Sequence, residues 1–435
     1  MSADAITASA STASASGSKK SLAGVFLIIG IIGLVIGLVA LVIGINTHNS
    51  RLGLSWLIGF TFWFAVLTGM LFLTQLSYLF NAGWSVIIRR QMENSLAAFK
   101  WLWVMLIPVV ILPIVMGDPG LVWKWMNPDA PVPGIHETTV GNDVLYLHKA
   151  GYLNVPFMIG RLVVYALVMC GLAALLRKNS FQNDLTADPK YWKNCRKISA
   201  AGIFLTSFCA TFAAFDLYMS LSYHWFSTMY GVWFFALSMR LGIAATAVLC
   251  FYLASKGRLK GIYKQSHAYF LGCLALAFTV FWAYISFSQY FLIYNANIPE
   301  ETFWYNMREM NIDGSKNSWW WVSMALIFGY FLFPFIRLLW HGTKIKPKSF
   351  RFISLWIMAF GLLDMWFNII PIQKPADNIL GFKTYPFLSS ALLVDIAMVI
   401  GVGGICIWAM LRSAAKHEAI PIHDPRILES IHAAE

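Results

Sequence analysis

The chain has 435 residues, of which 59% are hydrophobic and only 12% are charged, and its mean hydropathy is +0.65. Soluble domains carry roughly 25% charged residues, so this composition excludes an ordinary soluble protein and indicates an integral membrane protein. The formal net charge of +12 would indicate a nucleic-acid partner in a soluble chain, but here its meaning depends on where the cations lie relative to the membrane.

The chain opens with residues 1–20, which are rich in Ser, Ala and Thr. This segment has too few apolar side chains to bury a core, and we expect it to be disordered. Ten apolar segments of roughly 20 residues follow, the length that an α-helix needs to cross a bilayer. They are Leu22–Ile45, Leu54–Leu79, Leu96–Val115, Val155–Leu176, Ile198–Leu221, Met229–Ala254, Ala268–Tyr294, Trp319–Leu339, Phe352–Ile370 and Phe387–Met410. We therefore expect an all-α polytopic membrane protein, with a ten-helix domain over residues 21–412 and a tail over residues 413–435.

Lys and Arg are distributed unequally between alternate loops. With the N-terminus inside, the inner segments hold 21 of these cations and the outer loops hold 7. Positively charged residues concentrate in the cytoplasmic loops of membrane proteins, so we expect the N-terminal segment and the C-terminal tail both to be cytoplasmic. The same asymmetry explains the net positive charge by the topology of the chain and by contact with anionic lipids, so no nucleic-acid partner is expected.

Three acidic residues, Asp216, Asp364 and Asp395, lie inside predicted spans. An acidic residue at the centre of a membrane helix costs about 2.5 to 3.5 kcal/mol on insertion scales, so it normally faces a bundle interior or a wet cavity. We interpret the three acids as candidate proton carriers. The alternative is that each only holds helices together through an ion pair with Arg161 or Arg240.

Two polar stripes follow helical spacing. The first leads from Asp216 toward the outer surface and predicts an outward proton path; its members are Thr206, Cys209, Asp216, Ser220, Tyr223 and His224. The second runs along the seventh segment, where interhelical hydrogen bonding is the alternative explanation. Its members are Thr279, Trp282, Ser286 and Gln289, with Tyr284 and Ser288 on an adjoining face.

Two further patterns concern helix packing. Gly30, Gly33, Gly37 and Gly44 lie along one face of the first segment, which allows close approach of another helix, in this chain or in another subunit. The sequence FDLYM at 215–219 is echoed by LDMWF at 363–367, four helices later. This echo favours two four-helix bundles, helices 2–5 and 6–9, with helices 1 and 10 at their flanks.

The pattern of Cys and His residues does not favour a metal or haem site. The 6 cysteines form no Cys-x-x-Cys motif, and the 9 histidines fall in loops, tails or helix ends, away from the bilayer depth at which haem b ligands lie. We therefore expect no metal, no redox cofactor and no catalytic residue in this chain.

The sequences DLYMSLSYHWF at 216–226 and FWAYISFSQYFLIYNANIPEE at 281–301 resemble the NrfD-like membrane subunits of bacterial alternative complex III. The tail sequence PIHDPR at 421–426 resembles the ActF type more than its sister, the ActC type. The resemblance implies a bacterial inner membrane, two four-helix bundles and a role in a quinol:cytochrome c oxidoreductase. It also implies partners: an ActC-like sister subunit, an iron-sulfur subunit and multihaem cytochrome c subunits, which hold the iron-sulfur clusters and haem c. A quinone, menaquinol or ubiquinol, is implied nearby, and the acid and histidine of the ActC-type quinol site carry over to Asp216 and His224.

Our leading hypothesis is a membrane subunit that supplies a proton path, quinone-site support and scaffolding, while partner subunits transfer the electrons. A proton-coupled secondary transporter is the first alternative, because intramembrane acids and repeated bundles also occur in transporters. A purely structural subunit, whose acids only pair with arginines, is the second.

Overall fold

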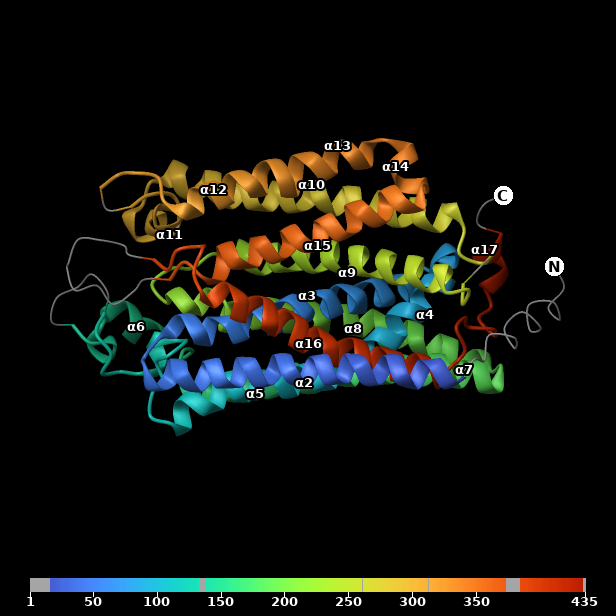
Figure 1. The fold of residues 1–435 in the computed structure, drawn as a ribbon, viewed down its shortest axis with the longest axis horizontal. Helices are drawn as coiled ribbons and strands as arrows, with labels where there is room; N and C mark the ends of the chain where they lie inside the picture. The colour runs from blue at the N-terminus through green and yellow to red at the C-terminus, as the bar shows by residue number, and fades with distance from the viewer. Residues whose placement is uncertain (1–15, 133–137, 260, 312, 373–383, 433–435) are drawn as a thin grey trace.

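The computed structural model describes residues 16–132, 138–259, 261–311, 313–372 and 384–432. It contains ten helices that are long and apolar enough to cross a membrane, and these helices run side by side along the longest axis of the molecule (Figure 1). Within the described ranges the regular structure is helical, with two isolated β-bridges and no strands. The predicted all-α, ten-helix membrane protein is therefore confirmed.

Most of the spanning helices are joined to the next by a short connection. They are α2 (Ser16–Asn46), α3 (Ser50–Leu79), α4 (Val86–Ser95) continued by α5 (Phe99–Val115), α7 (Val155–Thr186), α8 (Pro189–Leu217), α9 (Met229–Ser255), α10 (Gln265–Ala296), α12 (Ser318–Ala325) continued by the π-helical segment η6 (Leu326–Leu332) and α13 (Phe333–Leu339), α15 (Pro347–Ile369) and α16 (Ala391–Ala414). Shorter helices lie in the connections and the tail: α6 (Val144–Lys149), α11 (Pro299–Glu309), α14 (His341–Ile345) and α17 (Ile427–Ile431). Residues 1–15 lie outside the described residues, and α2 already begins at Ser16, within the segment that we expected to be disordered.

Capping side chains set several of these boundaries. Asn154 and Asp188 precede α7 and α8, and their side chains accept hydrogen bonds from the backbone N–H groups of Phe157 and Lys190. The end of α10 is marked by Asn297, which adopts the left-handed conformation with φ 50°. The cap at Asp188 starts α8 nine residues before the predicted apolar segment, whereas the cap at Asn154 starts α7 at Val155, as predicted.

Helix α3 lies at the centre of the packing. It contacts α5 and α8, and α7 contacts both α5 and α8; in the other half of the chain α9 contacts α10 and α15, while α13 contacts α10 and α15. Helices α3 and α9 also pack directly against each other. The division into two separate four-helix bundles therefore stays a prediction.

The glycine stripe of α2 faces α16. A Cβ atom at Gly33 would lie 2.5 Å from the Cα atom of Gly401, a separation at which only glycine fits. Gly30 and Gly37 face Ile405 and Met398 of the same helix. The fourth glycine, Gly44, instead faces the turn between α2 and α3, so the partner of the stripe lies within this chain.

The C-terminal residues are docked against one end of the bundle, where α14 and α17 lie, while α6 and α11 lie at the opposite end (Figure 1). Arg89 of α4 pairs with Asp424, and Gln91 Nε2 donates a hydrogen bond to the carbonyl of Ala419, at 2.7 Å. The hydroxyl of Ser430 in α17 donates to the carbonyl of Trp84, at 3.0 Å. The segment that we expected to be a simple tail thus covers the end of α4.

Candidate functional site

Asp216, at the end of α8, is held by a guanidinium group. Arg161 of α7 donates from Nε and Nη2 to the two carboxylate oxygens, both at 2.9 Å, and Tyr165 donates from its hydroxyl at 2.9 Å. The Asp216 side chain is completely buried. The bidentate contact makes Asp216 one half of a buried ion pair that joins α7 to α8, as the ion-pair alternative proposed.

Asp395 of α16 has a similar partner in Arg51, at the start of α3. The two guanidinium nitrogens Nη1 and Nη2 donate to Oδ1 at 2.9 Å and to Oδ2 at 2.5 Å. The sequence offered Arg161 and Arg240 as partners for Asp395, and the structure shows Arg51 in their place. In the sequence Arg51 precedes the predicted span Leu54–Leu79 and is one of the seven outer-loop cations. The structure instead places it inside the packed helices, 4% exposed.

Asp364 of α15 differs from the other two acids. Its carboxylate accepts hydrogen bonds from uncharged donors: the indole Nε1 atoms of Trp282 and Trp233, at 2.9 and 3.2 Å, and the amide of Asn368, at 3.1 Å. Within the described ranges no Lys, Arg or His side chain forms an ion pair with it. Of the three acids, Asp364 is thus the one that can take up or release a proton without breaking an ion pair.

Arg240 of α9 lies near this carboxyl but is engaged elsewhere. Its Nη2 donates to the carbonyl of Tyr330 at 2.7 Å, and its guanidinium lies over the rings of Tyr330 and Trp282, at 3.6 and 5.1 Å from their centroids. The carbonyl of Tyr330 is available because Pro334, four residues later, has no N–H to donate to it. This proline also explains why the helix widens into the π-helical segment η6 just before it.

A cavity of about 640 Å³ adjoins Asp364 and is bounded by α10, α11, α12, η6 and α15. Its volume lies within the range of roughly 300 to 1,000 Å³ that small-molecule sites occupy. Aromatic side chains form much of its wall, and they include Trp233, Trp282, Trp304, Tyr305 and Trp320. Polar side chains lie among these aromatic and aliphatic groups and can orient a largely apolar ligand by hydrogen bonds; they are Ser286, Gln289, Glu309, Lys316, Ser323, Asp364 and Asn368.

Glu309, at the end of α11, is a second carboxyl on the wall of this cavity. Burial raises the pKa of Glu309, and the hydrogen bond from Tyr294 and the charge of Lys316 oppose this rise only in part. The cavity therefore has one carboxyl inside a spanning helix and another in the connection beyond it.

Arg308 fixes α11 against the end of α15. Its guanidinium donates to the carbonyls of Trp304, Phe367 and Asn368, at 2.7, 2.9 and 3.1 Å. Burial lowers the pKa of Arg308 to about 9, which leaves the group charged at neutral pH. The charge at the C-terminal end of α15 interacts favourably with the helix dipole and holds one wall of the cavity in place.

The two predicted polar stripes have different outcomes. Trp282, Ser286 and Gln289 of the second stripe do line the cavity, and Gln289 donates to the hydroxyl of Tyr305, at 3.1 Å. Thr279 is buried and donates to the carbonyl of Ala275 within its own helix. The two residues of the adjoining face do not line the cavity. The Tyr284 side chain is 63% exposed, and Ser288 is half-buried.

The first stripe is interrupted at its outer end. Ser220 donates to the backbone carbonyl of Asp216 rather than to its carboxylate, and Thr206 accepts from Gln75 of α3. Over the described part of the chain, no hydrogen bond joins the carboxylate of Asp216 to Tyr223 or His224.

Tyr223 and His224 instead bind Asp143, which precedes α6. The Tyr223 hydroxyl donates to Oδ2 at 2.8 Å, and His224 Nε2 lies 2.5 Å from the same oxygen. Burial alone would raise the pKa of Asp143, but the hydrogen bonds from His224 and Tyr223 outweigh it and lower the pKa. This cluster ties the α6 segment to the connection between α8 and α9.

Sequence analysis missed a buried ionic network around α4. Arg89 and Arg90 both approach Glu93, at 3.4 Å, and Arg90 also pairs with Asp184 at 2.5 Å. The Tyr78 hydroxyl donates to Glu93 at 2.6 Å. The available signal was the spacing of three and four residues from the two arginines to Glu93, which places all three side chains together on a helix.

Comparison of the sequence with protein-family models gave no match, and comparison with curated proteins gave no significant match. The residues and their geometry are therefore the basis on which function is inferred.

Proposed function

We propose that the chain is an integral membrane subunit of a quinol-oxidising respiratory complex, and that Asp364 accepts protons released in that reaction. One observation carries the proposal: the carboxylate of Asp364 accepts hydrogen bonds from uncharged donors, forms no ion pair within the described residues, and lines a large cavity. Asp216 and Asp395, by contrast, are neutralised by bidentate arginines.

The cavity suits the ring of a quinol as substrate. Its aromatic walls match a flat apolar molecule, and the exposed side chains of Phe287 and Ile327 line it from the lipid-facing side. Quinol oxidation requires a proton acceptor within hydrogen-bond reach of the hydroxyl. Asp364 supplies that acceptor, and the indoles of Trp282 and Trp233 hold its oxygens in position.

Glu309 gives the proton an exit from the cavity. It lines the same cavity and lies in the connection between α10 and α12, outside the spanning helices. Burial raises the pKa of Glu309 above its ordinary value, so this carboxyl accepts a proton more readily than a solvated glutamate does. In this proposal the proton passes from Asp364 through the cavity to Glu309, while electrons pass to iron-sulfur clusters and haem c on partner subunits.

The remaining acids then serve as helix ties. The Asp216 and Arg161 pair joins α8 to α7, and the Asp395 and Arg51 pair joins α16 to α3. The likeness to the membrane subunits of alternative complex III supports the setting of the proposal, a bacterial inner membrane with an ActC-like sister subunit and the cytochrome subunits around the chain. The proposed site at Asp364 departs from the residues that the resemblance carried over, Asp216 and His224, because Asp216 is paired with Arg161.

Purification in mild detergent tests the assembly. Haem c absorbance and iron-sulfur signals that co-elute with the chain support a respiratory complex. A lone stable chain that transports a solute would favour the secondary transporter instead.

Replacement Asp364→Asn tests the site within the purified complex. Removal of a positioned proton acceptor typically costs 10²- to 10⁴-fold, so we expect quinol oxidation and the accompanying proton release to fall at least about 100-fold. Ser288→Ala is the matched control, because Ser288 is a half-buried polar residue of the same helix, α10, and does not line the cavity; we expect its rate to stay within about threefold of wild type. An Asp364→Asn complex that retains its subunits and oxidises quinol at the normal rate refutes the assignment.

A further inference from the structure

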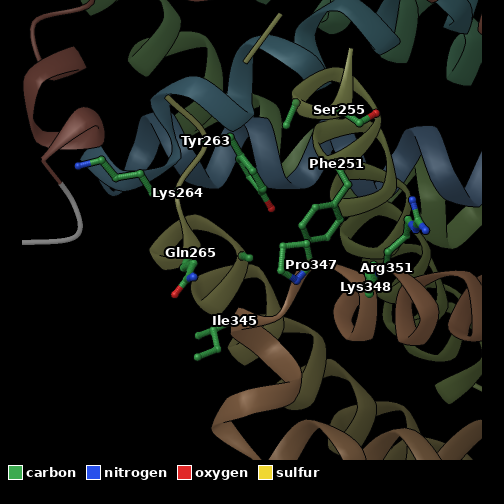
Figure 2. A pocket seen from close by; sticks show the side chains of 11 residues that line it. Phe251, Ser255, Tyr263, Lys264, Gln265, Ile345, Pro347, Lys348 and Arg351 are labelled. Atoms are coloured by element: carbon green, nitrogen blue, oxygen red, sulfur yellow. The ribbon is translucent and has the colours of Figure 1, made fainter. Parts of the chain in front are cut away.

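A second cavity lies at the other end of the helices, where α9 ends and α10 and α15 begin. It measures about 290 Å³ and has Phe251, Tyr263, Pro347, Lys348 and Arg351 in its wall. Figure 2 shows the Tyr263 hydroxyl directed between Phe251 and Pro347, with Arg351 beyond Phe251. The cavity lies far along the helices from Asp364, so its role is independent of the function proposed above.

The segments around this cavity carry positive charge without compensation. Residues 255–265 and 340–351 contain eight Lys and Arg residues and neither Asp nor Glu. No carboxylate of the described chain forms an ion pair with Lys264, Lys348 or Arg351. All three cations line the cavity, and Figure 2 shows the Lys264 side chain directed away from Tyr263 and Pro347, so the test below changes Lys348 and Arg351.

Two kinds of hydrogen-bond donor face the same space. The Tyr263 hydroxyl is shielded from solvent and has no hydrogen-bond partner within the described part of the chain. Helix α15 begins at Pro347, and its N-cap, Lys346, forms no side-chain cap to the first-turn N–H groups of Lys348 and Ser349, at the helix end where the dipole favours an anion.

The surroundings of the cavity are apolar and face outward. Phe352 and Leu355, which follow Arg351 on α15, are 51% and 48% exposed. Cations at the end of a spanning helix, next to exposed apolar side chains, match the boundary between lipid headgroups and acyl chains. The geometry points to a binding site for the phosphate group of an anionic phospholipid, with its acyl chains along α15.

The test measures thermal stability of the purified protein, with any subunits that remain bound, in detergent micelles containing increasing phosphatidylglycerol. Each cation near a membrane surface contributes about a fivefold factor to attraction of an anionic lipid. We therefore expect Lys348→Gln/Arg351→Gln to need about 25-fold more phosphatidylglycerol for half of the wild-type rise in Tm. Tyr263→Phe should weaken the response without changing the charge.

Arg412→Gln/Lys416→Gln is the matched control, since both side chains are exposed cations on the same end of the molecule and neither lines the cavity. It should respond to phosphatidylglycerol as wild type does. Equal responses of wild type and the Lys348/Arg351 variant overturn the site, and an equal loss in the control variant shows only a bulk charge effect, which also overturns it. The same rise in Tm with inorganic phosphate alone would show a soluble-anion site and overturn the assignment to lipid.

Discussion

The pair between Arg51 and Asp395 gives a quantitative prediction about how the helices are held together. Both side chains are buried, at 5% and 0% exposure, and they share two charge-assisted hydrogen bonds. Hydrogen bonds to charged groups contribute about 1.5 to 3 kcal/mol each, and removal of one partner of a buried pair costs about 3 to 5 kcal/mol. An ordinary interhelical hydrogen bond in a membrane contributes roughly 0.6 kcal/mol. We therefore expect Asp395→Leu to lower the free energy of unfolding by about 3 to 5 kcal/mol, because it leaves a guanidinium buried without its countercharge.

A double-mutant cycle separates the pair from the packing around it. Unfolding by sodium dodecyl sulfate in mixed micelles, followed by tryptophan fluorescence, gives the free energies of Asp395→Leu, Arg51→Met and the double variant. The double variant removes both charges and should lie within about 1 kcal/mol of wild type, since hydrophobic replacement of a buried pair is often neutral. A single variant as stable as wild type, or a double variant whose loss equals the sum of the two single losses, refutes the reasoning.

Two further predictions follow from close contacts. Gly33→Leu should lower stability by about 1 to 3 kcal/mol and separate α2 from α16, because its Cβ would lie 2.5 Å from the Cα of Gly401; Gly24→Leu, whose Cβ meets nothing within 4 Å, is the control, and equal Tm values of the two variants contradict the contact. Tyr223→Phe should cost about 1.5 to 3 kcal/mol at neutral pH, because its hydroxyl donates to the ionised Asp143. Since the pKa of Asp143 is lowered in the folded protein, this stabilisation is present above the ordinary carboxyl pKa of about 4 and is lost as the pH falls through the folded value. The Tm difference between wild type and Tyr223→Phe should therefore shrink between pH 7 and pH 3, and a difference independent of pH contradicts the assignment.

The spans could be predicted from the sequence because their signal is local. Twenty consecutive apolar residues identify a membrane helix whatever lies beside it, and all ten predicted segments correspond to helices of the structure. The glycine stripe likewise identified a face for close packing. Its partner could not be predicted, because Gly401 lies in the last spanning helix, and nothing local to Gly33 indicates which helix approaches it.

Which cation pairs with each intramembrane acid also depends on contacts between residues that are far apart in the sequence. Arg51 and Asp395 are 344 residues apart, and the position of Arg51 at the edge of an apolar segment is typical of a loop cation. The sequence offers Arg161 and Arg240 as candidate partners for each of the three acids, and their positions alone do not distinguish the pair of Arg161 with Asp216 from a pair with Asp364. The carboxyl that has no arginine could be identified only once the helices were placed.

The position of Glu309 on the cavity wall could likewise be found only from the structure. In the sequence it is one of several acids in a long connection, where solvated carboxylates are ordinary. Its place on the cavity wall arises because α11 folds back over the end of α15, where Arg308 binds the carbonyls of Phe367 and Asn368. No periodic pattern in the connection encodes that contact.

The most direct test of the central claim is labelling of the membrane-embedded protein by dicyclohexylcarbodiimide at neutral pH, followed by peptide mass spectrometry. This apolar reagent reaches carboxyls from the lipid phase and reacts with the protonated form. An Asp364 that exchanges protons and borders a large cavity should be modified, whereas Asp216 and Asp395, each held in a bidentate ion pair with an arginine, should not be. Modification of Asp216 or Asp395 with Asp364 left unmodified would contradict the account.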